Sequence, residues 1–400
     1  MQALLKCAKV AAVFALAVFV PGIAKAQHYT QKNLVSDISQ PDNADGSKVL
    51  LDPNLRNPWG LTRSSGSPFW IGNNNSGTST LYDGTGAPQN FFPDPHPDSN
   101  GNGINSPFNN FVVVPPPGFA PGTQSAPTGV VFNGSPTDFQ VAPGKAALFI
   151  FATEDGTISG WSPKVDPINP VLKVDNSDKG SANSAVYKGM TSGEVKGQKF
   201  LYVTNFRSAQ VEVYNTNFQL VHFRDAHSDN DAFDDDSIPR GFAPFNIQNI
   251  GGSLFVTYAK QDGPRHDPVG GDGFGFVDIF STSGKLQGRL EHGDWFNAPW
   301  GVVWTPRDFG EFSNTILVGN FRSGWIAAFN GFTKKFIGFV RNPDDSLVTI
   351  DGLWSLTFGN NGGAGSSDTL FFTAGGADEL HGLFGTLTPV PAELADGDEE

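Results

Sequence analysis

The sequence predicts an all-β fold, a six-bladed β-propeller that is closed by an N-terminal strand completing the last blade. A turn of the Pro-Trp-Gly type recurs six times, short apolar runs follow each turn, and no stretch after residue 26 has the apolar spacing of an amphipathic helix. The central residues of the first two turns, Gly60 and Gly129, lie 69 residues apart, and those of the last two, Gly301 and Ser355, lie 54 apart. Repeats of this length indicate stacked units of a few strands each.

Each module supplies its strands in the same order. The turn motifs, which begin the innermost strands, lie at 57–61, 126–130, 186–190, 243–247, 298–302 and 351–356. Second strands are expected at 69–72, 147–153, 200–205, 254–259, 316–320 and 370–374. Third strands are expected at 79–84, 157–163, 210–215, 275–281, 324–330 and 381–387. Outer strands are expected in modules 3, 4 and 5, at 219–226, 285–292 and 334–342. Four short strands in each of six units make a six-bladed propeller.

The two ends of the repeat complete each other. The sixth module stops after its third strand, because Pro389 and Pro391 end the apolar pattern. The segment 28–37 has the composition of a strand but precedes the first module. Closure of the ring would remove the exposed sheet edges that otherwise invite pairing with other chains. We therefore expect Tyr29–Val35 to form the outer strand of the sixth blade, within one propeller domain that spans residues 27–390.

The N-terminus predicts the compartment. Lys6 and Lys9 precede the apolar run 10–20, and Ala24 and Ala26 offer small residues at a cleavage point, a pattern typical of a secretory signal peptide over residues 1–26. We expect the mature protein to be secreted or periplasmic, without a membrane span, because no second apolar run is long enough. Residues 391–400 are expected to form an acidic flexible tail.

Charge and cysteine content exclude several functions. Loss of residues 1–26 removes three of the 26 basic residues and no acidic one, which leaves 23 basic against 40 acidic residues, or a net charge of −17. Nucleic acid is therefore not an expected partner, since its phosphates require clustered Lys and Arg. The single cysteine, Cys7, lies in the signal, so neither a disulfide nor a thiol nucleophile is expected. We expect a monomer.

Six segments carry a family resemblance. They lie at 51–61, 149–163, 241–262, 297–302, 350–360 and 379–387, and include LDPNLRNPWGL and FIFATEDGTISGWSP. Over nearly all of its mature length the chain resembles an uncharacterised family of exported bacterial β-propeller proteins. Some members have an exosortase-type C-terminal sorting tail, which is absent here because the chain ends in Asp-Gly-Asp-Glu-Glu. The family has no established activity, so the resemblance implies the architecture without a mechanism.

Polar residues of the turn motifs are the first candidates for a site. The propeller geometry would place Asn57, Asn246, Asn297 and Asp351 around one mouth of the central channel. Trp59, Trp300 and Trp354 would lie close by. A ring of such oxygen ligands could hold calcium and activate a lactone, an ester or a water, as in propeller hydrolases of the gluconolactonase or paraoxonase kind. The alternative is structural, because Asn and Asp at turns also cap backbone groups.

Three further positions could bind ligands. Glu154 and its neighbour Asp155 form an acidic pair in a turn, although adjacent residues at a strand end normally point apart. Arg207 and Arg322 occur in the repeated tripeptide Asn-Phe-Arg and could bind an anionic group through two hydrogen bonds. Their recurrence equally favours a structural role, in which each arginine stacks on the neighbouring phenylalanine.

The acidic run 229–236 is the first candidate for metal binding, and the run 266–273, which begins with His266 and Asp267, is a weaker one. Asp229, Asp231, Asp234 and Asp236 could supply oxygen ligands to calcium, but the run does not match the EF-hand pattern. A solvated acidic loop is the alternative. Calcium is the only cofactor that the sequence suggests, since the histidines have no zinc-binding spacing and no phosphate-binding loop or nucleophile elbow is present.

Together these patterns favour an extracytoplasmic binding module over an enzyme. A rigid scaffold with long loops and no catalytic motif fits a protein that holds a glycan, a peptide or a matrix component. The alternative is a calcium-assisted hydrolase or lactonase with its site at the channel mouth, and a third reading is a purely structural surface protein. No catalytic residue can be assigned from the sequence.

Overall fold

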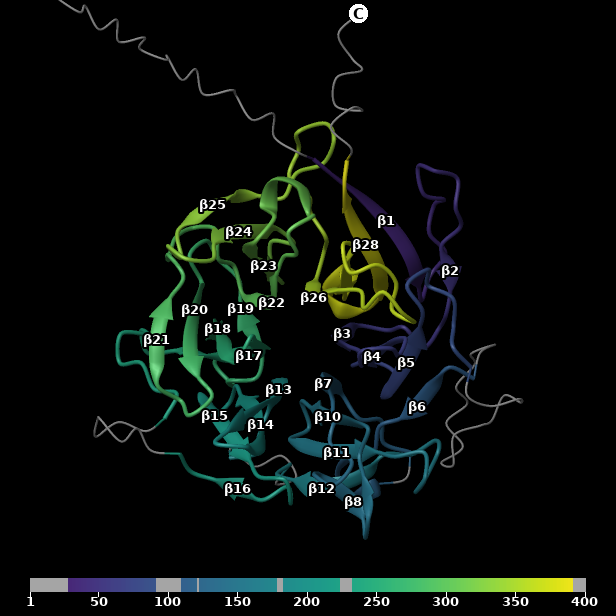
Figure 1. The fold of residues 1–400 in the computed structure, drawn as a ribbon, viewed down its shortest axis with the longest axis vertical. Coiled ribbons are helices and arrows are strands. Elements are labelled where there is room, and N and C mark those ends of the chain that lie inside the picture. The colour runs from purple at the N-terminus through teal and green to yellow at the C-terminus, as the bar shows by residue number, and fades with distance from the viewer. Residues whose placement is uncertain (1–27, 91–108, 121, 178–182, 224–231, 391–400) are drawn as a thin grey trace, which may run out of the picture.

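Six β-sheets surround one central axis in the computed structural model, which describes residues 28–90, 109–120, 122–177, 183–223 and 232–390 (Figure 1). The prediction of a six-bladed β-propeller is therefore confirmed. The expected signal peptide at 1–26 and the acidic tail at 391–400 lie outside the described residues. Among the described residues, no helix has the length and the apolar character needed to cross a membrane.

Blades 1 to 3 follow one another along the chain. Blade 1 contains β3 (Pro58–Thr62), β4 (Phe69–Asn73), β5 (Thr78–Tyr82) and β6 (Phe111–Val113). Blade 2 contains β7 (Pro127–Phe132), β10 (Phe149–Thr153), β11 (Thr157–Trp161) and β12 (Val171–Asp175). Blade 3 contains β13 (Tyr187–Val195), β14 (Gln198–Asn205), β15 (Gln210–Tyr214) and β16 (Leu220–Val221). The outer strands β6 and β12 were not expected from the sequence, and part of the outer strand expected at 219–226 lies outside the described residues.

Blades 4 to 6 complete the ring. Blade 4 contains β17 (Phe242–Ile250), β18 (Ser253–Gln261), β20 (Gly275–Ser281) and β21 (Leu286–Arg289), with β19 (Pro268–Val269) paired to β18. Blade 5 contains β22 (Pro299–Trp304), β23 (Thr315–Asn320), β24 (Ile326–Asn330) and β25 (Phe336–Phe339). Blade 6 contains β26 (Leu353–Phe358), β27 (Leu370–Ala374), β28 (Leu383–Pro389), β1 (Tyr29–Ser36) and β2 (Leu50–Leu51). The remaining short elements are the hairpin β8 (Gln140–Ala142) and β9 (Lys145–Ala146), η1 (Pro117–Phe119), η3 (Gly310–Phe312) and α1 (Gly376–Glu379).

The N-terminal strand closes the ring as predicted. β1 pairs antiparallel with β28 from Tyr29 opposite Pro389 to Ser36 opposite Leu383, which makes it the next strand outward in blade 6. Tyr29 is fully buried, and its hydroxyl donates a hydrogen bond to the carbonyl oxygen of Phe309 in blade 5 at 2.9 Å. The purple and yellow ends of the chain therefore lie side by side in Figure 1. β2 adds a parallel strand outside β1, which the sequence did not suggest.

Aromatic side chains fill the channel at one level. Trp59, Phe245, Trp300 and Trp354 come from four innermost strands and belong to one buried cluster, here called the aromatic cluster. Trp59 and Trp354 stack with ring centroids 3.6 Å apart, and Trp300 meets Trp354 edge-on at 5.8 Å. The glycine that follows in the motif has a steric cause. A Cβ at Gly129 would lie 2.5 Å from the backbone nitrogen of Met190 in the neighbouring inner strand, closer than van der Waals contact allows.

Candidate functional site

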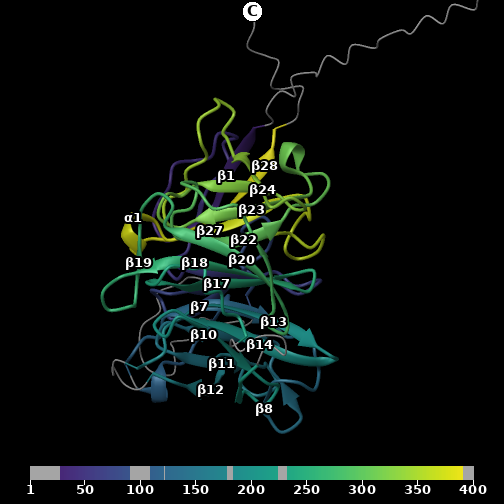
Figure 2. The same cartoon turned by 90° about the vertical axis from the view of Figure 1, so that its left-hand side faces the viewer.

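The candidate site lies on the face that carries the turns between second and third strands. Antiparallel pairing places the start of each inner strand beside the end of its second strand, as with Pro58 opposite Asn73 and Pro299 opposite Asn320. This side is called the loop face. β19 and α1 are insertions into these turns in blades 4 and 6, and Figure 2 shows them on the same side of the molecule.

Lys188 is the central residue of the site. It occupies the position just before the central glycine of the third motif. The residues at that position in the other five motifs are Trp59, Thr128, Phe245, Trp300 and Trp354. The Lys188 side chain is fully buried. Burial of an ammonium group is costly unless partners compensate for the lost water, so the groups around it define the site.

Two carboxylates hold the ammonium. Lys188 Nζ forms an ion pair with Glu154, from the turn between β10 and β11, and lies 3.4 Å from Asp267 Oδ1, in the segment before β19. Burial acts to lower the pKa of Lys188, but the charges of Glu154 and Asp267 outweigh it and the pKa is raised. Lys188 therefore remains a cation at neutral pH and is not available as an amine nucleophile or base.

Aromatic rings form the other wall around the ammonium. Nζ lies 5.1 Å from the ring centroid of Trp59 and 5.8 Å from that of Phe206, both within the range of a cation–π interaction. The backbone carbonyl of Lys188 accepts a hydrogen bond from Trp300 Nε1 at 3.1 Å. Lys188 thus contacts both the aromatic cluster in the channel and the turns that carry Glu154 and Asp267.

A second layer of amides and carboxylates surrounds this pair. Asn74 Nδ2 donates to Glu154 Oε2 at 2.7 Å, and Asn57 Nδ2 donates to Glu379 Oε2 at 2.8 Å. Glu379 comes from α1 of blade 6. Burial raises the pKa of Glu379, the negative charge of Glu154 adds to this effect, and the hydrogen bond from Asn57 opposes it. The site therefore collects side chains from blades 1, 2, 3, 4 and 6.

His266 and Asp267 complete a group that could hold a metal ion. Ligand atoms of Glu154, His266 and Asp267 lie within 4.8 Å of one another, and this is the one such group among the residues that the structure describes. His266 Nδ1 lies 2.9 Å from Asp267 Oδ1, and this hydrogen bond raises the pKa of His266 against the effect of burial. One imidazole and two carboxylates suit zinc or manganese better than calcium, which prefers oxygen ligands. A metal here would share both carboxylates with the ammonium of Lys188.

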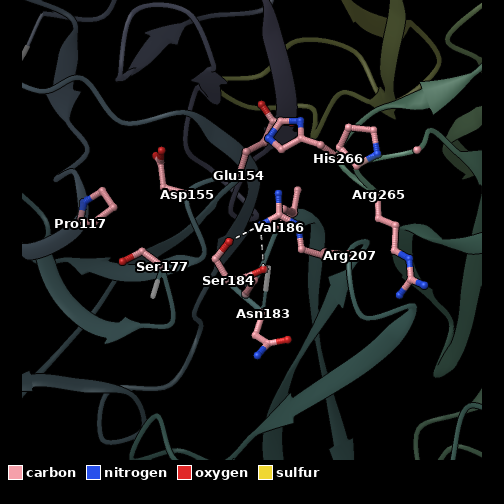
Figure 3. Close-up of a pocket in the computed structure, with 13 residues that line it drawn as sticks. Pro117, Glu154, Asp155, Ser177, Asn183, Ser184, Val186, Arg207, Arg265 and His266 are labelled. Carbon is pink, nitrogen blue, oxygen red and sulfur yellow. Dashed lines mark hydrogen bonds between the residues drawn. The ribbon is translucent and has the colours of Figure 1, made fainter. Parts of the chain in front are cut away.

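A pocket of about 820 Å³ opens beside these residues, between the turns of blades 2, 3 and 4 (Figure 3). It is called the loop-face pocket. The residues that line it are Pro117, Glu154, Asp155, Ser177, Asn183, Ser184, Ala185, Val186, Arg207, Gly263, Pro264, Arg265 and His266. Most are polar or charged and come from turns in which the modules differ. A cavity of this size with several converging polar groups is typical of a site for a small ligand.

The structure brings only some of the sequence candidates into this site. Glu154 and Arg207 line the loop-face pocket, and Asn57 binds Glu379 while its Oδ1 accepts a hydrogen bond from Trp354 Nε1 at 3.0 Å. Asp155 Oδ2 accepts from the backbone nitrogen of Ala126, so it faces away from the partners of Glu154, as expected for adjacent carboxylates.

The other turn-motif candidates have separate partners. Asn246 donates to the carbonyl of Trp300 at 2.8 Å and borders a small cavity of about 30 Å³ within the channel. Asn297 Oδ1 accepts from the backbone nitrogen of Gly271, and Asp351 Oδ2 accepts from that of Ala377. Each oxygen therefore binds a different backbone group, which matches the structural alternative for these residues.

Arg322 fits the stacking alternative. Its guanidinium lies 4.7 Å from the ring centroid of Phe321 and donates to the carbonyl of Pro268 at 3.2 Å. Of the calcium candidates, Asp229 and Asp231 lie outside the described residues. Asp235, between Asp234 and Asp236, pairs with Arg289 at 2.7 Å, so this part of the acidic run is tied to blade 4.

Sequence reasoning missed Lys188 and Glu379, and it offered His266 and Asp267 only within the weaker calcium candidate 266–273. The signal for Lys188 was present, since it is the one charged residue at a motif position that is aromatic in four of the six modules. Glu379 follows the last second strand rather than a module start, so a search confined to the motifs passed over it. His266 and Asp267 lie in a loop whose shape the sequence does not determine.

Three uncharacterised proteins of Acanthamoeba polyphaga mimivirus are similar in sequence. One is 29% identical over 351 residues, covering 86% of this chain and 78% of that protein. Another is 27% identical over 342 residues, covering 84% of this chain and 81% of its own length. The third is 31% identical over 241 residues, and the chain spans 43% of its length. No protein-family model matches the chain.

These relatives correct the resemblance drawn from the sequence segments. The expectation of an exported bacterial family is wrong, because the relatives are uncharacterised mimivirus proteins. Four of the segments that carried the resemblance include the start of an inner strand, where close backbone approach requires glycine at positions such as Gly60 and Gly301, and the other two include a turn between a second and a third strand. Such segments mark the propeller repeat and do not identify the lineage.

The solved structures that resemble this protein in backbone fold have low sequence identity to it. A protein of unknown function from Bacteroides thetaiotaomicron has a TM-score of 0.49 at 9% identity, covering 91% of this chain and 77% of its own. A catalytically inactive virginiamycin B lyase from Staphylococcus aureus has a TM-score of 0.44 at 9% identity, covering 91% and 100%. A gluconolactonase from Xanthomonas campestris has a TM-score of 0.34 at 14% identity, covering 66% and 86%. At these scores the likenesses carry no conclusion about activity.

Proposed function

We propose that this protein is an extracytoplasmic binding module that holds a small polar ligand in the loop-face pocket. One observation carries the proposal: a cavity of about 820 Å³ lies at the turns where the modules differ, and its lining is mostly polar or charged. Repeated positions serve the packing of the propeller, whereas differences between modules are free to serve recognition. The signal peptide predicted at 1–26 supports an extracytoplasmic location.

The charges next to the pocket favour binding over catalysis. Lys188 is neutralised by Glu154 and Asp267, and Glu154 also accepts from Asn74. Groups engaged in this way hold their geometry, and each already has a partner in the absence of a substrate. A rigid polar wall of this kind suits a ligand that is held unchanged.

Two glycines provide a direct test. A Cβ at Gly263, which lines the pocket, and one at Gly66, which lies elsewhere, would each meet no heavy atom within 4 Å. Gly263→Trp should therefore fill the pocket without a clash at the backbone, and Gly66→Trp is its matched control. Binding of neutral saccharides, acidic saccharides and short peptides is measured by isothermal titration calorimetry on the purified protein.

We expect at least one of these classes to bind the native protein and the Gly66→Trp variant, and to lose about tenfold or more in affinity with Gly263→Trp. Unfolding temperatures of both variants confirm that the fold is intact. Equal binding by both variants would place the ligand elsewhere, and the absence of binding by all three classes would contradict the proposal.

Fractionation of the native host would test the location of the protein. Retention of the protein inside the cell would contradict the extracytoplasmic part of the proposal.

A metal-assisted hydrolase is the second candidate, because Glu154, His266 and Asp267 can approach one ion. Such an ion could polarise an ester or lactone carbonyl or activate water. Addition of zinc, manganese or calcium should then raise the unfolding temperature of the native protein and not that of His266→Ala, and should support hydrolysis of a lactone. A shift without hydrolysis would indicate a structural metal only.

A further inference from the structure

The loop-face pocket has cationic and anionic walls. Arg207, Arg265 and His266 line it from blades 3 and 4, and Glu154 and Asp155 line it from blade 2. In Figure 3, Asp155 lies on one side of the view and Arg265 on the other, with Arg207 between them. None of the described residues that line the pocket is Phe, Tyr or Trp, so the flat face of a sugar ring would find no benzene or indole ring to stack on.

Arg207 is held in place with donors to spare. Its Nη1 donates to the carbonyl oxygen of Ser184 at 3.2 Å and to the Ser184 hydroxyl (Figure 3, dashed lines). A guanidinium has five N–H donors, and the other nitrogens of Arg207 make no hydrogen bond with the described residues. A fixed guanidinium with free donors is suited to a carboxylate or phosphate oxygen pair.

Arg265 lies in a turn that is held by hydrogen bonds to Asp262. Asp262 Oδ1 accepts from the backbone nitrogen of His266 at 2.7 Å, and the Asp262 carbonyl accepts from that of Arg265 at 3.2 Å. Arg265 has a φ of 58°, a left-handed conformation that non-glycine residues adopt infrequently. Its guanidinium is exposed and has no hydrogen bond or ion pair within the described ranges. The Arg265 guanidinium is therefore a second cationic group with free donors, and it lies at the rim of the pocket.

Asp155 is the acceptor left on the opposite wall. Both carboxylate oxygens of Glu154 are engaged, by Lys188 and by Asn74. One oxygen of Asp155 accepts from Ala126 at 2.8 Å, and no described side chain donates to the other. Burial raises the pKa of Asp155, and the charge of Glu154 adds to this effect against the backbone hydrogen bond. A bound ammonium group would lower that pKa again.

We infer that the loop-face pocket takes a dipolar ligand, a short peptide with free ends whose carboxylate binds Arg207 and Arg265 and whose ammonium binds Asp155. This inference rests on the proposed binding function and narrows it to one ligand class. Charge complementarity of this kind selects against ligands that leave a buried ionic group unpaired. The chain as a whole carries a net negative charge, so the two arginines at this pocket differ in sign from the charge of most of its ionisable side chains.

Matched peptides test both ends separately. The probes are Ala-Ala-Ala and Ala-Phe-Ala with free ends, each with its N-acetylated and its C-amidated form, and maltose and inorganic phosphate serve as the neutral and the anionic controls. Affinities are measured by titration calorimetry against the native protein, Asp155→Asn and Arg265→Gln. Both side chains lie at the pocket surface. The unfolding temperatures of the two variants are recorded as well, to show that each variant is folded.

Blocking either end should weaken binding to the native protein about tenfold or more, the effect of losing a charge-assisted hydrogen bond. N-acetylation should no longer matter in Asp155→Asn, and C-amidation should matter less in Arg265→Gln. These pairings distinguish a direct contact from a general loss of structure.

The contrary outcomes are distinct. Peptide binding that ignores both end groups overturns the inference, and so does binding of maltose or of phosphate alone with no binding of peptides. The last two results would leave the proposed binding function standing if Gly263→Trp abolishes them. If peptides, saccharides and phosphate all fail to bind, the inference and the proposed function fail together.

Discussion

Blade 3 and blade 5 put different residues at the same place, and the difference shows how the site arises. Trp300 of blade 5 packs among the rings of the aromatic cluster, while Lys188 of blade 3 brings an ammonium to the equivalent position. Because Trp300 and Lys188 occupy the same position of the repeated motif, both side chains enter the channel. The neighbouring turns then decide what each can do there, since Glu154 and Asp267 supply the charges that a buried lysine requires.

The largest effect is expected for the aromatic side of this comparison. Trp354 is fully buried, stacks on Trp59 at 3.6 Å and on Phe321 at 4.0 Å, and donates to Asn57. Trp354→Ala should lower the free energy of unfolding by about 4 kcal/mol, because a large cavity opens at the axis. Urea denaturation gives the value, and Trp325→Ala, at a half-buried tryptophan, should cost clearly less. Equal losses would mean that the channel rings are not central to stability.

A smaller effect is expected for the charged side. Lys188→Met keeps most of the volume but leaves the Glu154 carboxylate, on a side chain that is 12% exposed, without its cationic partner. The free energy of unfolding should fall by about 2–3 kcal/mol, less than for a fully enclosed pair because the Asp267 side chain is 55% exposed.

The double variant Lys188→Met, Glu154→Gln separates the charge from the packing. Removing both ionic groups should recover most of the stability lost in Lys188→Met, since no unpaired buried carboxylate is left. Denaturation of all four members of the cycle measures the coupling. If the double variant is as unstable as the sum of the single ones, the two residues do not depend on each other.

The fold followed from the sequence because its causes are local and repeated. Alternating apolar runs recur in each module, and a glycine is the central residue in four of the six turn motifs. The closing strand Tyr29–Val35 could be placed because module six ends without an outer strand. The outer strands β6 and β12 escaped notice because they are short or lie partly exposed at the blade edge, where the apolar signal is weak.

The site followed only in part, because the candidates did not occupy one repeat position. Asn57 lies three residues before the central residue Gly60, Asn297 lies four before Gly301, and Asn246 is itself a central residue. Side chains at such different positions point in different directions, so they cannot form one ring. Glu379 and Asp267 join the site through insertions in the turns of other blades, and only the closed ring brings them near Lys188.

Protonation of the outer carboxylate should have a smaller and pH-dependent effect. Burial raises the native-state pKa of Glu379 above its ordinary value of 4.5. As pH rises past 4.5 the unfolded chain therefore loses its proton first, so the free energy of unfolding falls until pH exceeds the native pKa, and this loss persists at higher pH. Glu379→Gln keeps an acceptor for Asn57 and cannot ionise, so it should be more stable than the native protein near pH 7 by about 1 kcal/mol.

That advantage should vanish below about pH 4, where Glu379 is protonated in both states. Thermal or urea unfolding from pH 4 to 8 measures it. Asp378→Asn is the matched control, since the Asp378 side chain is 91% exposed and its replacement should change stability by about 0.5 kcal/mol or less at any pH. A constant difference across the range would show that packing, and not ionisation, separates Glu379→Gln from the native protein.

The smallest effect concerns the two copies of Asn-Phe-Arg, which look alike in sequence and differ in their contacts. Arg322 stacks on Phe321, whereas Phe206 receives the ammonium of Lys188 and Arg207 turns into the loop-face pocket. Arg322→Ala should therefore cost about 0.5–1 kcal/mol of stability and leave ligand binding unchanged. Arg207→Ala should weaken binding of an anionic ligand with a smaller change in unfolding temperature. The reverse pattern would mean that the repeated motif serves recognition in blade 5 and packing in blade 3.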